Sequence, residues 1–170
     1  MISVTSSRIT IADGSKEGNR VAAAVVHRDN TKCVLLPDTA SIFRTELYAL
    51  LLAIDVVRHS KEKKFVIFSD SMSSLQSIYG FNLDSDLVQK FLKDYTIVAK
   101  NCKNIILCLI PSHVGIFGNE KADAAAKSAF SLPVTRMKPP ATDMYPHITK
   151  LKFDNTCDKN QLSRLSDTVG

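Results

Sequence analysis

Apolar and polar residues along the first part of the chain follow patterns typical of β-strands. Residues 8–12 (RITIA) alternate, and we interpret Asp13-Gly14-Ser15 as the turn that ends this strand. Residues 21–27 (VAAAVVH) and 31–36 (TKCVLL) are two further runs separated by Asp29-Asn30, a turn sequence. The pattern therefore predicts a first strand followed by a β-hairpin.

The chain then alternates helical and strand patterns up to residue 130. Apolar residues recur at helical spacing after residue 41, at Leu47, Leu50, Leu51, Ile54 and Val57. Two short runs that are apolar on both faces predict buried parallel strands, 64–69 (KFVIFS) and 104–110 (NIILCLI). Further helices are predicted over residues 71–78, 84–100 and 120–130, with Ser71 as a helix cap and Leu87, Phe91, Leu92, Tyr95 and Val98 inward in the second. This order predicts an α/β fold, a mixed sheet with helices on both faces.

The periodicity fades after residue 130, where four prolines recur among Ser, Thr, Asp and Asn. We therefore predict one folded domain over residues 1–130 and a proline-containing linker or weakly ordered tail over residues 131–170.

Composition and charge narrow the class of protein. Hydrophobic residues make up 45% of the chain and charged residues 23%, as in soluble globular proteins. No apolar run approaches the roughly 20 residues that span a bilayer, and the N-terminus lacks the apolar core of a signal peptide. We expect an intracellular protein, cytoplasmic or nuclear, with no membrane partner. The net charge of +5 suits a polyanionic partner and equally a lysine-rich soluble surface.

The four cysteines show neither C-x-x-C pairs nor the spacing of a zinc site. We expect no disulfide and no structural zinc, with Cys33 and Cys108 as buried small hydrophobic residues.

Four acidic residues stand where an α/β domain would bring them together. Asp13 and Asp70 end predicted strands, and Glu46 and Asp123 lie near the starts of predicted helices. Carboxylates that cluster repel one another unless a cation lies between them, so the four predict a site for hard divalent cations. Taken singly, each has an ordinary alternative: a turn residue, a first-turn helix acid, a cap, or a solvated helix acid.

The motifs around these acids resemble the type 1 ribonuclease H family, and most closely the ribonuclease H domains of non-LTR retrotransposon polyproteins. Five blocks carry the resemblance in order over residues 9–130: Asp13-Gly14-Ser15-Lys16, 40–49 (ASIFRTELYA), 65–71 (FVIFSDS), 110–116 (IPSHVGI) and 118–123 (GNEKAD). The resemblance implies a five-stranded mixed sheet of order 3-2-1-4-5 flanked by helices. It also implies cleavage of the RNA strand of RNA–DNA hybrids, and an upstream reverse transcriptase domain in a longer polyprotein.

The resemblance also assigns roles to residues. Asp13, Glu46, Asp70 and Asp123 would hold two Mg²⁺ ions, for which Mn²⁺ is expected to substitute, and His113 would be the mobile catalytic histidine. Asp13 would bridge both ions, Asp123 would complete the ion that activates water, and Glu46 and Asp70 the ion that stabilises the 3′-oxygen. We also consider four polar residues near these acids as contacts to the nucleic acid: Ser15, Lys16, Ser71 and Asn119. Turn and cap chemistry is an equal alternative for each of them.

The chain departs from the family pattern in several places. Residues 19–22 (NRVA) stand where relatives often have glycines, the chain has no Trp, and no basic insertion appears between Gly80 and Lys103. We therefore expect weak affinity for hybrid in the isolated domain. Two alternatives stay open: a catalytically weak or inactive nucleic-acid-binding module of the same fold, and a related metal nuclease or strand-transfer enzyme.

Overall fold

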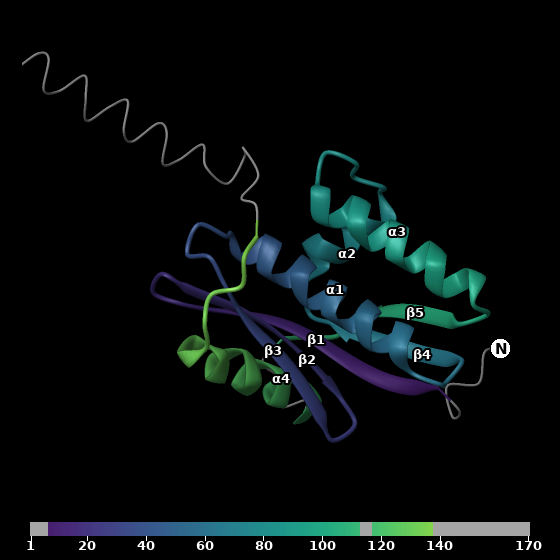
Figure 1. The fold of residues 1–170 in the computed structure, drawn as a ribbon, viewed down its shortest axis with the longest axis horizontal. Helices are drawn as coiled ribbons and strands as arrows, with labels where there is room; N and C mark the ends of the chain where they lie inside the picture. The colour runs from purple at the N-terminus through teal and green to yellow at the C-terminus, as the bar shows by residue number, and fades with distance from the viewer. Residues whose placement is uncertain (1–6, 113–116, 138–170) are drawn as a thin grey trace, which may run out of the picture. The chain divides into compact units, whose positions relative to one another are not determined.

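A single five-stranded sheet, of order β3-β2-β1-β4-β5, organises the protein in a computed structural model that describes residues 7–112 and 117–137 (Figure 1). The strands are β1 (Arg8–Glu17), β2 (Arg20–His27), β3 (Asn30–Leu36), β4 (Lys64–Ser69) and β5 (Asn104–Leu109). β1, β2 and β3 pair antiparallel in sequence, whereas β4 pairs parallel with both β1 and β5. The predicted mixed sheet and its strand order are confirmed.

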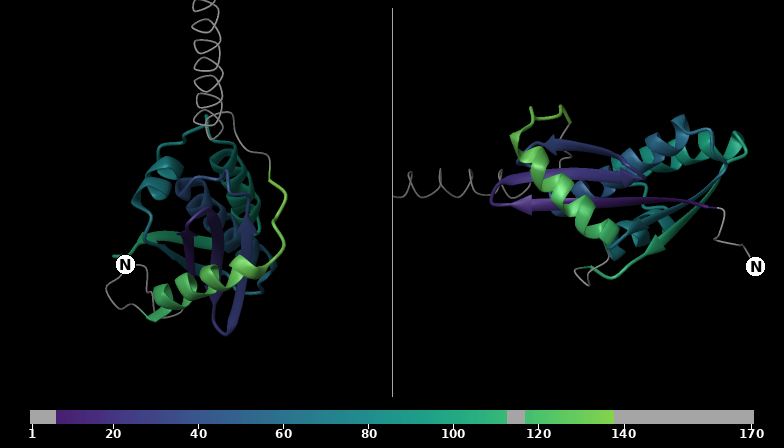
Figure 2. Two further views of the ribbon diagram at one scale, coloured as in Figure 1. Left: turned by 90° about the vertical axis from the view of Figure 1, so that its left-hand side faces the viewer. Right: turned by 90° about the horizontal axis from the view of Figure 1, so that it is seen from below.

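Helices cover both faces of this sheet, as Figure 2 shows. They are α1 (Ile42–His59), α2 (Met72–Tyr79), α3 (Asp86–Lys100), α4 (Phe117–Ser128) and the short 3₁₀ helix η2 (Ala129–Ser131). α1 packs on β1 and β2 and also contacts α3, while α4 lies against β1, β2 and β3. None of these helices is long and apolar enough to cross a membrane in the part of the chain that the structure describes.

The apolar run of β2 explains why both faces are covered. Alternate residues of a strand point to opposite faces. Val21, Ala23 and Val25 belong to the core beneath α1, whereas Ala22 and Ala24 belong to a second cluster with α4. A strand buried on both sides must be apolar throughout, so the run VAAAVV indicates a central strand.

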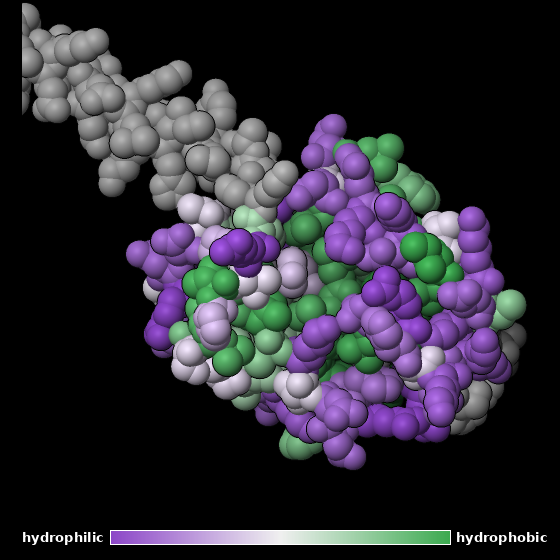
Figure 3. Space-filling model, viewed as in Figure 1, coloured by the Kyte–Doolittle hydropathy of each residue, from purple (hydrophilic) through white to green (hydrophobic). Residues whose placement is uncertain are grey.

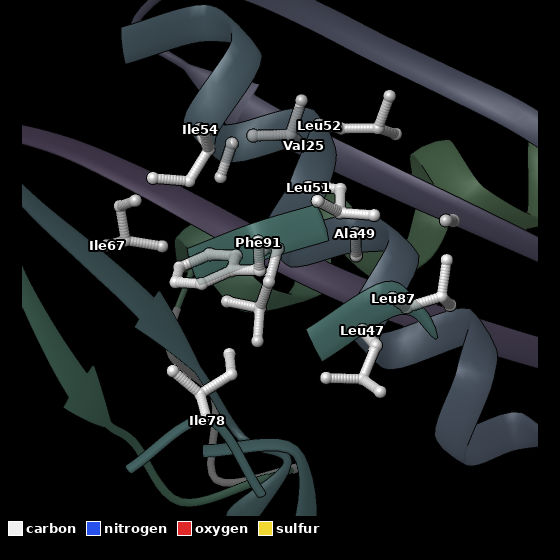
Figure 4. Close-up of a cluster of buried hydrophobic side chains, with 14 of the residues drawn as sticks. Val25, Leu47, Ala49, Leu51, Leu52, Ile54, Ile67, Ile78, Leu87 and Phe91 are labelled. Carbon is white, nitrogen blue, oxygen red and sulfur yellow. The ribbon is translucent and has the colours of Figure 1, made fainter. Parts of the chain in front are cut away.

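The main core lies between the sheet and α1. Figure 4 shows Leu47, Leu51 and Ile54 of α1 beside Ile67 of β4 and Phe91 of α3. All five apolar residues that recur at helical spacing in the predicted first helix are buried on α1. The face viewed in Figure 3 is largely hydrophilic, with apolar side chains visible in patches between the polar ones.

The turn predicted at Asp13-Gly14-Ser15 is wrong. These residues continue β1 and pair with Ala24, Ala23 and Ala22 of β2, and the chain turns instead at Gly18, whose φ of +59° favours glycine. The pairing of β1 with β4 ends at Ile11 and Phe68. Because β2 continues beside β1 after β4 has stopped, β1 stays extended through Asp13 with one edge open.

Smaller differences concern element ends and side-chain burial. α4 begins at Phe117, three residues before the predicted start at residue 120. Tyr95 of α3, expected inside, is 37% exposed, because the inward stripe of that helix runs through Leu87, Val88, Phe91 and Val98 instead. Cys33 and Cys108 lie on the edge strands and are only half-buried, not buried as expected.

The end of α1 is held by a lysine from the start of β5. The Nζ of Lys103 donates to the carbonyl oxygens of Val57, Arg58 and Ser60 at 2.5, 2.9 and 2.6 Å. The last carbonyls of a helix have no partner within the helix, and a cation there also complements the helix dipole. Lys103 therefore fixes the end of α1 that lies away from Glu46.

The outer edge of β3 is paired at Leu35, near the end of the strand. The backbone N–H of Thr135 donates to the carbonyl oxygen of Leu35 at 2.7 Å, and Val134 forms a parallel bridge with the same residue. Met137 packs against the main core. Ordered packing thus continues past η2 to residue 137, whereas the predicted tail beyond it lies outside the described residues.

Candidate metal centre

Three carboxylates from three separate elements converge at the open edge of β1. Asp13 lies on β1, Glu46 in the first turns of α1, and Asp70 directly after β4. Each offers one oxygen, and these oxygens all lie within 4.8 Å of one another. Asp13 and Asp70 meet because β1 and β4 run parallel and stop pairing just before these residues.

Gly14 allows α1 to approach β1 at this point. Its backbone N–H donates to Oε2 of Glu46 at 3.1 Å. A Cβ on Gly14 would lie 3.0 Å from both the carboxyl carbon and the backbone nitrogen of Glu46, and 3.1 Å from Cγ2 of Thr45. The glycine is therefore needed for contact distance, and its N–H fixes one oxygen of Glu46.

The start of α1, which carries Glu46, is held on two sides. The side chain of Ser41 accepts from the backbone N–H of Arg44 at 3.3 Å and caps the helix. The buried guanidinium of Arg44 donates to both carboxyl oxygens of Asp86 on α3, at 2.6 and 3.2 Å. A bidentate pair of this kind restrains orientation as well as distance.

Burial and neighbouring negative charge raise the pKa of Glu46 and of Asp13. Burial raises the pKa of Glu46 to about 9, with further contributions from the charges of Asp13 and Asp70. Burial, followed by the charges of Asp70 and Asp123, raises the pKa of Asp13 to about 7. Ionising these carboxyls together is therefore costly unless a cation lies between them, and carboxylate oxygens are the donors that hard divalent cations prefer. The donor set fits a hard divalent cation.

The three converging carboxylates line a cavity of about 350 Å³. Asp123, the fourth predicted ligand, lines this cavity too, but its carboxylate is not one of the three that converge. Its Oδ2 accepts a hydrogen bond from Nζ of Lys127, one turn further along α4, at 2.7 Å. The sequence analysis did not single out Lys127, although its spacing of four residues from Asp123 places the two side chains on one face of a helix.

The predicted substrate contacts occupy different surroundings. Ser71 lines the cavity and caps α2, as predicted, by accepting from the backbone N–H of Ser74. Lys16 is exposed, whereas Ser15 is only 6% exposed, on the same face of β1 as Asp13. Asn119 is buried, and its Nδ2 donates to Oδ2 of Asp70 at 3.1 Å.

The amide oxygen of Asn119, Oδ1, is buried without a hydrogen-bond partner among the described residues. The amide nitrogen must face Asp70, because a carboxylate only accepts, so this orientation follows from chemistry.

The predicted catalytic histidine, His113, lies outside the described residues. The cavity also includes two residues that the sequence analysis did not single out, Ser73 and Ser112, although both stand within or beside the motifs around the acids. Their hydroxyl groups add to the polar lining of the cavity.

Two comparisons with known proteins bear on this arrangement. A comparison with functionally curated proteins finds none that matches. A protein-family model described as RNase H matches residues 6–131, which include all five strands and all the acidic residues of the cavity. Since this match covers well over half of the chain, the chain belongs to the ribonuclease H family.

Proposed function

We propose that this protein is an endoribonuclease that hydrolyses the RNA strand of RNA–DNA hybrids with the help of two divalent cations. The observation that carries the proposal is the convergence of Asp13, Glu46 and Asp70 within 4.8 Å in a ribonuclease H domain. A buried cluster of carboxylates is costly in a folded protein unless a cation compensates it.

Asp13, Glu46, Asp70 and Asp123 would hold the cations, Mg²⁺ or Mn²⁺. When bound, such ions supply an activated water, charge stabilisation and orientation of the scissile phosphate. The backbone N–H of Gly14 keeps one oxygen of Glu46 in place, and Asn119 engages Oδ2 of Asp70, which leaves Oδ1 of Asp70 available.

Other side chains of the site are suited to the nucleic acid. Ser71 lines the cavity, and Lys16 is exposed near the end of β1, three residues after Asp13. Hydroxyl groups can bond sugar hydroxyls, which distinguish RNA from DNA, and an exposed ammonium can pair with phosphate. Ser15 and Asn119 are buried, so they would act by supporting the acidic residues more than by direct contact. His113 would transfer protons or assist product release.

The first alternative is a catalytically weak or inactive binding module of the same fold. A protein that only binds a polyanion would gain affinity by losing the acidic cluster, so the retained carboxylates favour the enzyme. A related metal nuclease of the same architecture is the second alternative, and substrate selectivity separates it from the proposed ribonuclease. The order of the motifs supports descent from a retrotransposon polyprotein with a neighbouring reverse transcriptase domain.

Cleavage of a labelled RNA–DNA hybrid tests the proposal. The reaction is run with Mg²⁺ beside single-stranded RNA, duplex RNA, duplex DNA and an EDTA control. We expect cleavage of the RNA strand of the hybrid only, lost in EDTA and in Asp13→Asn. Asp84→Asn, which changes an exposed aspartate outside the cavity, is the matched control and should cleave normally. Cleavage that persists in Asp13→Asn would refute the metal assignment, and absence of cleavage by folded protein would favour the binding module.

A further inference from the structure

Lys127 occupies a carboxylate that the proposed reaction needs. Its Nζ lies 2.7 Å from Oδ2 of Asp123, and Asp123 is the one acid of the cavity that stands apart from the three converging carboxylates. The Lys127 side chain is 57% exposed and that of Asp123 26% exposed, so the pair lies at the rim of the cavity.

We propose that Lys127 is an internal competitor for cations at Asp123. In the cation-free protein the ammonium group neutralises Asp123, while Asp13, Glu46 and Asp70 remain without a cationic partner in the part of the chain described. A first cation then binds to these three residues, and a second cation must compete with Lys127 for the carboxylate of Asp123. This proposal rests on the proposed function and concerns the order in which its two cations bind.

The position of the pair separates it from an ordinary surface contact. An acid followed four residues later by a lysine is a common stabilising pair on a helix, and most such pairs affect nothing else. Here the paired carboxylate faces an acidic cavity, where the same negative field attracts either the ammonium group or a metal ion. Bringing a cation to Asp123 requires that the existing pair be broken or shared.

A contrasting role for Lys127 would be to orient Asp123 for metal binding. The two roles predict effects of opposite sign when the lysine is removed. A competitor weakens cation binding, so its removal tightens binding, whereas an orienting residue strengthens it, so its removal loosens binding. The sign of the change in cation affinity is therefore decisive.

Isothermal titration of the full chain with Mn²⁺, in the absence of nucleic acid, measures this sign. We expect Lys127→Met to bind Mn²⁺ roughly three- to tenfold more tightly, since one exposed positive charge beside a divalent ion has an effect of this order. Lys127→Arg keeps the charge and should bind like the wild type. The gain should vanish when Lys127→Met is combined with Asp123→Asn, because the competitor then has no carboxylate to release.

Three results would overturn the proposal. Unchanged or weaker Mn²⁺ binding in Lys127→Met, with Asp13-dependent binding intact in the wild type, refutes the competitor and leaves the proposed metal site standing. A gain that survives in the Asp123→Asn background shows that the effect does not pass through Asp123. Wild-type protein that binds Mn²⁺ no better than Asp13→Asn removes both the metal site and the competitor. Circular dichroism checks that each variant is folded; Lys127 is exposed near the end of α4, so the helix should tolerate its replacement.

Discussion

Asp13 should destabilise the cation-free protein, so replacing it with asparagine should make that form more stable. The carboxyl is only 5% exposed and lies beside two other acids. Asparagine has nearly the same shape and carries no charge, so Asp13→Asn removes the cost of burying a charge and the repulsion, and leaves the packing nearly intact. The same substitution should abolish cation binding, because it replaces a charged carboxylate ligand of the cluster with a neutral amide.

The magnitude follows from the pKa of Asp13, which is raised from 3.8 to about 7 in the folded protein. A group whose pKa is raised on folding binds its proton more tightly in the folded state. Its contribution to stability is therefore fully present below the unfolded pKa and is lost as the pH rises toward about 7. A pKa raised by about 3 lowers the free energy of unfolding by roughly 4 kcal/mol when the pH rises from acid to pH 8. Burial is the largest cause of the raised pKa, followed by the charges of Asp70 and Asp123. Asparagine must still bury a polar amide, so we expect Asp13→Asn to recover roughly 2 kcal/mol.

Urea unfolding in EDTA at pH 5 and pH 8 measures this effect. The free energy of unfolding of the wild type should fall between these values more steeply than that of Asp13→Asn, so the variant gains most at pH 8. Mg²⁺ at pH 8 should stabilise the wild type and leave Asp13→Asn unchanged, since only the wild type keeps the donor set. Asp84→Asn is the control for replacing an aspartate and should behave like the wild type. An Asp13→Asn variant that is less stable than the wild type in EDTA at pH 8 would refute the electrostatic reasoning.

Three further predictions concern supports of the site and the fold. Gly14→Ala should weaken Mn²⁺ binding at least roughly tenfold in a calorimetric titration, because its Cβ would force Glu46 and α1 away from β1. Gly18→Ala, which has open space around it but a φ of +59°, should lower only the thermal midpoint, and equal loss of binding in both would contradict the steric argument. Asn119→Ala should weaken Mn²⁺ binding roughly tenfold by freeing Asp70, and unchanged affinity would show that the hydrogen bond does not hold this ligand. Lys103→Met should lower the free energy of unfolding by about 1–2 kcal/mol in urea without changing Mn²⁺ affinity, and a fall in affinity would mean that the far end of α1 also positions the site.

Periodicity allowed the sheet and the inward face of α1 to be predicted, because burial imposes a period that local sequence preserves. The run VAAAVV in β2 is apolar throughout since α1 and α4 cover its two faces. Local turn preference was misleading at Asp13-Gly14-Ser15, where pairing with β2 extends β1 beyond a sequence that normally ends a strand. Here a contact between strands overrides the preference of single residues.

The convergence of the acids was only partly foreseeable. Three of the four predicted acids come together because the start of α1 lies where the parallel pairing of β1 and β4 ends. Asp123 lies apart from these three and is paired with Lys127. The spacing of four residues allowed this pair, but it did not show whether the carboxylate would contact Lys127 or join the other acids. The burial of Ser15 and Asn119 likewise depends on packing between elements that are distant along the chain.

The short contact of residues 134 and 135 with Leu35 has a practical consequence for handling the protein. An outer strand with free backbone groups can pair with a strand of another molecule and so begin aggregation. The N–H of Thr135 binds the carbonyl oxygen of Leu35 and so blocks strand pairing at this end of the β3 edge. A chain cut at residue 131, where the family match ends, would lose this protection, whereas one that extends to residue 137 would retain it. The six residues between these points could therefore decide whether the domain is recovered as a monomer.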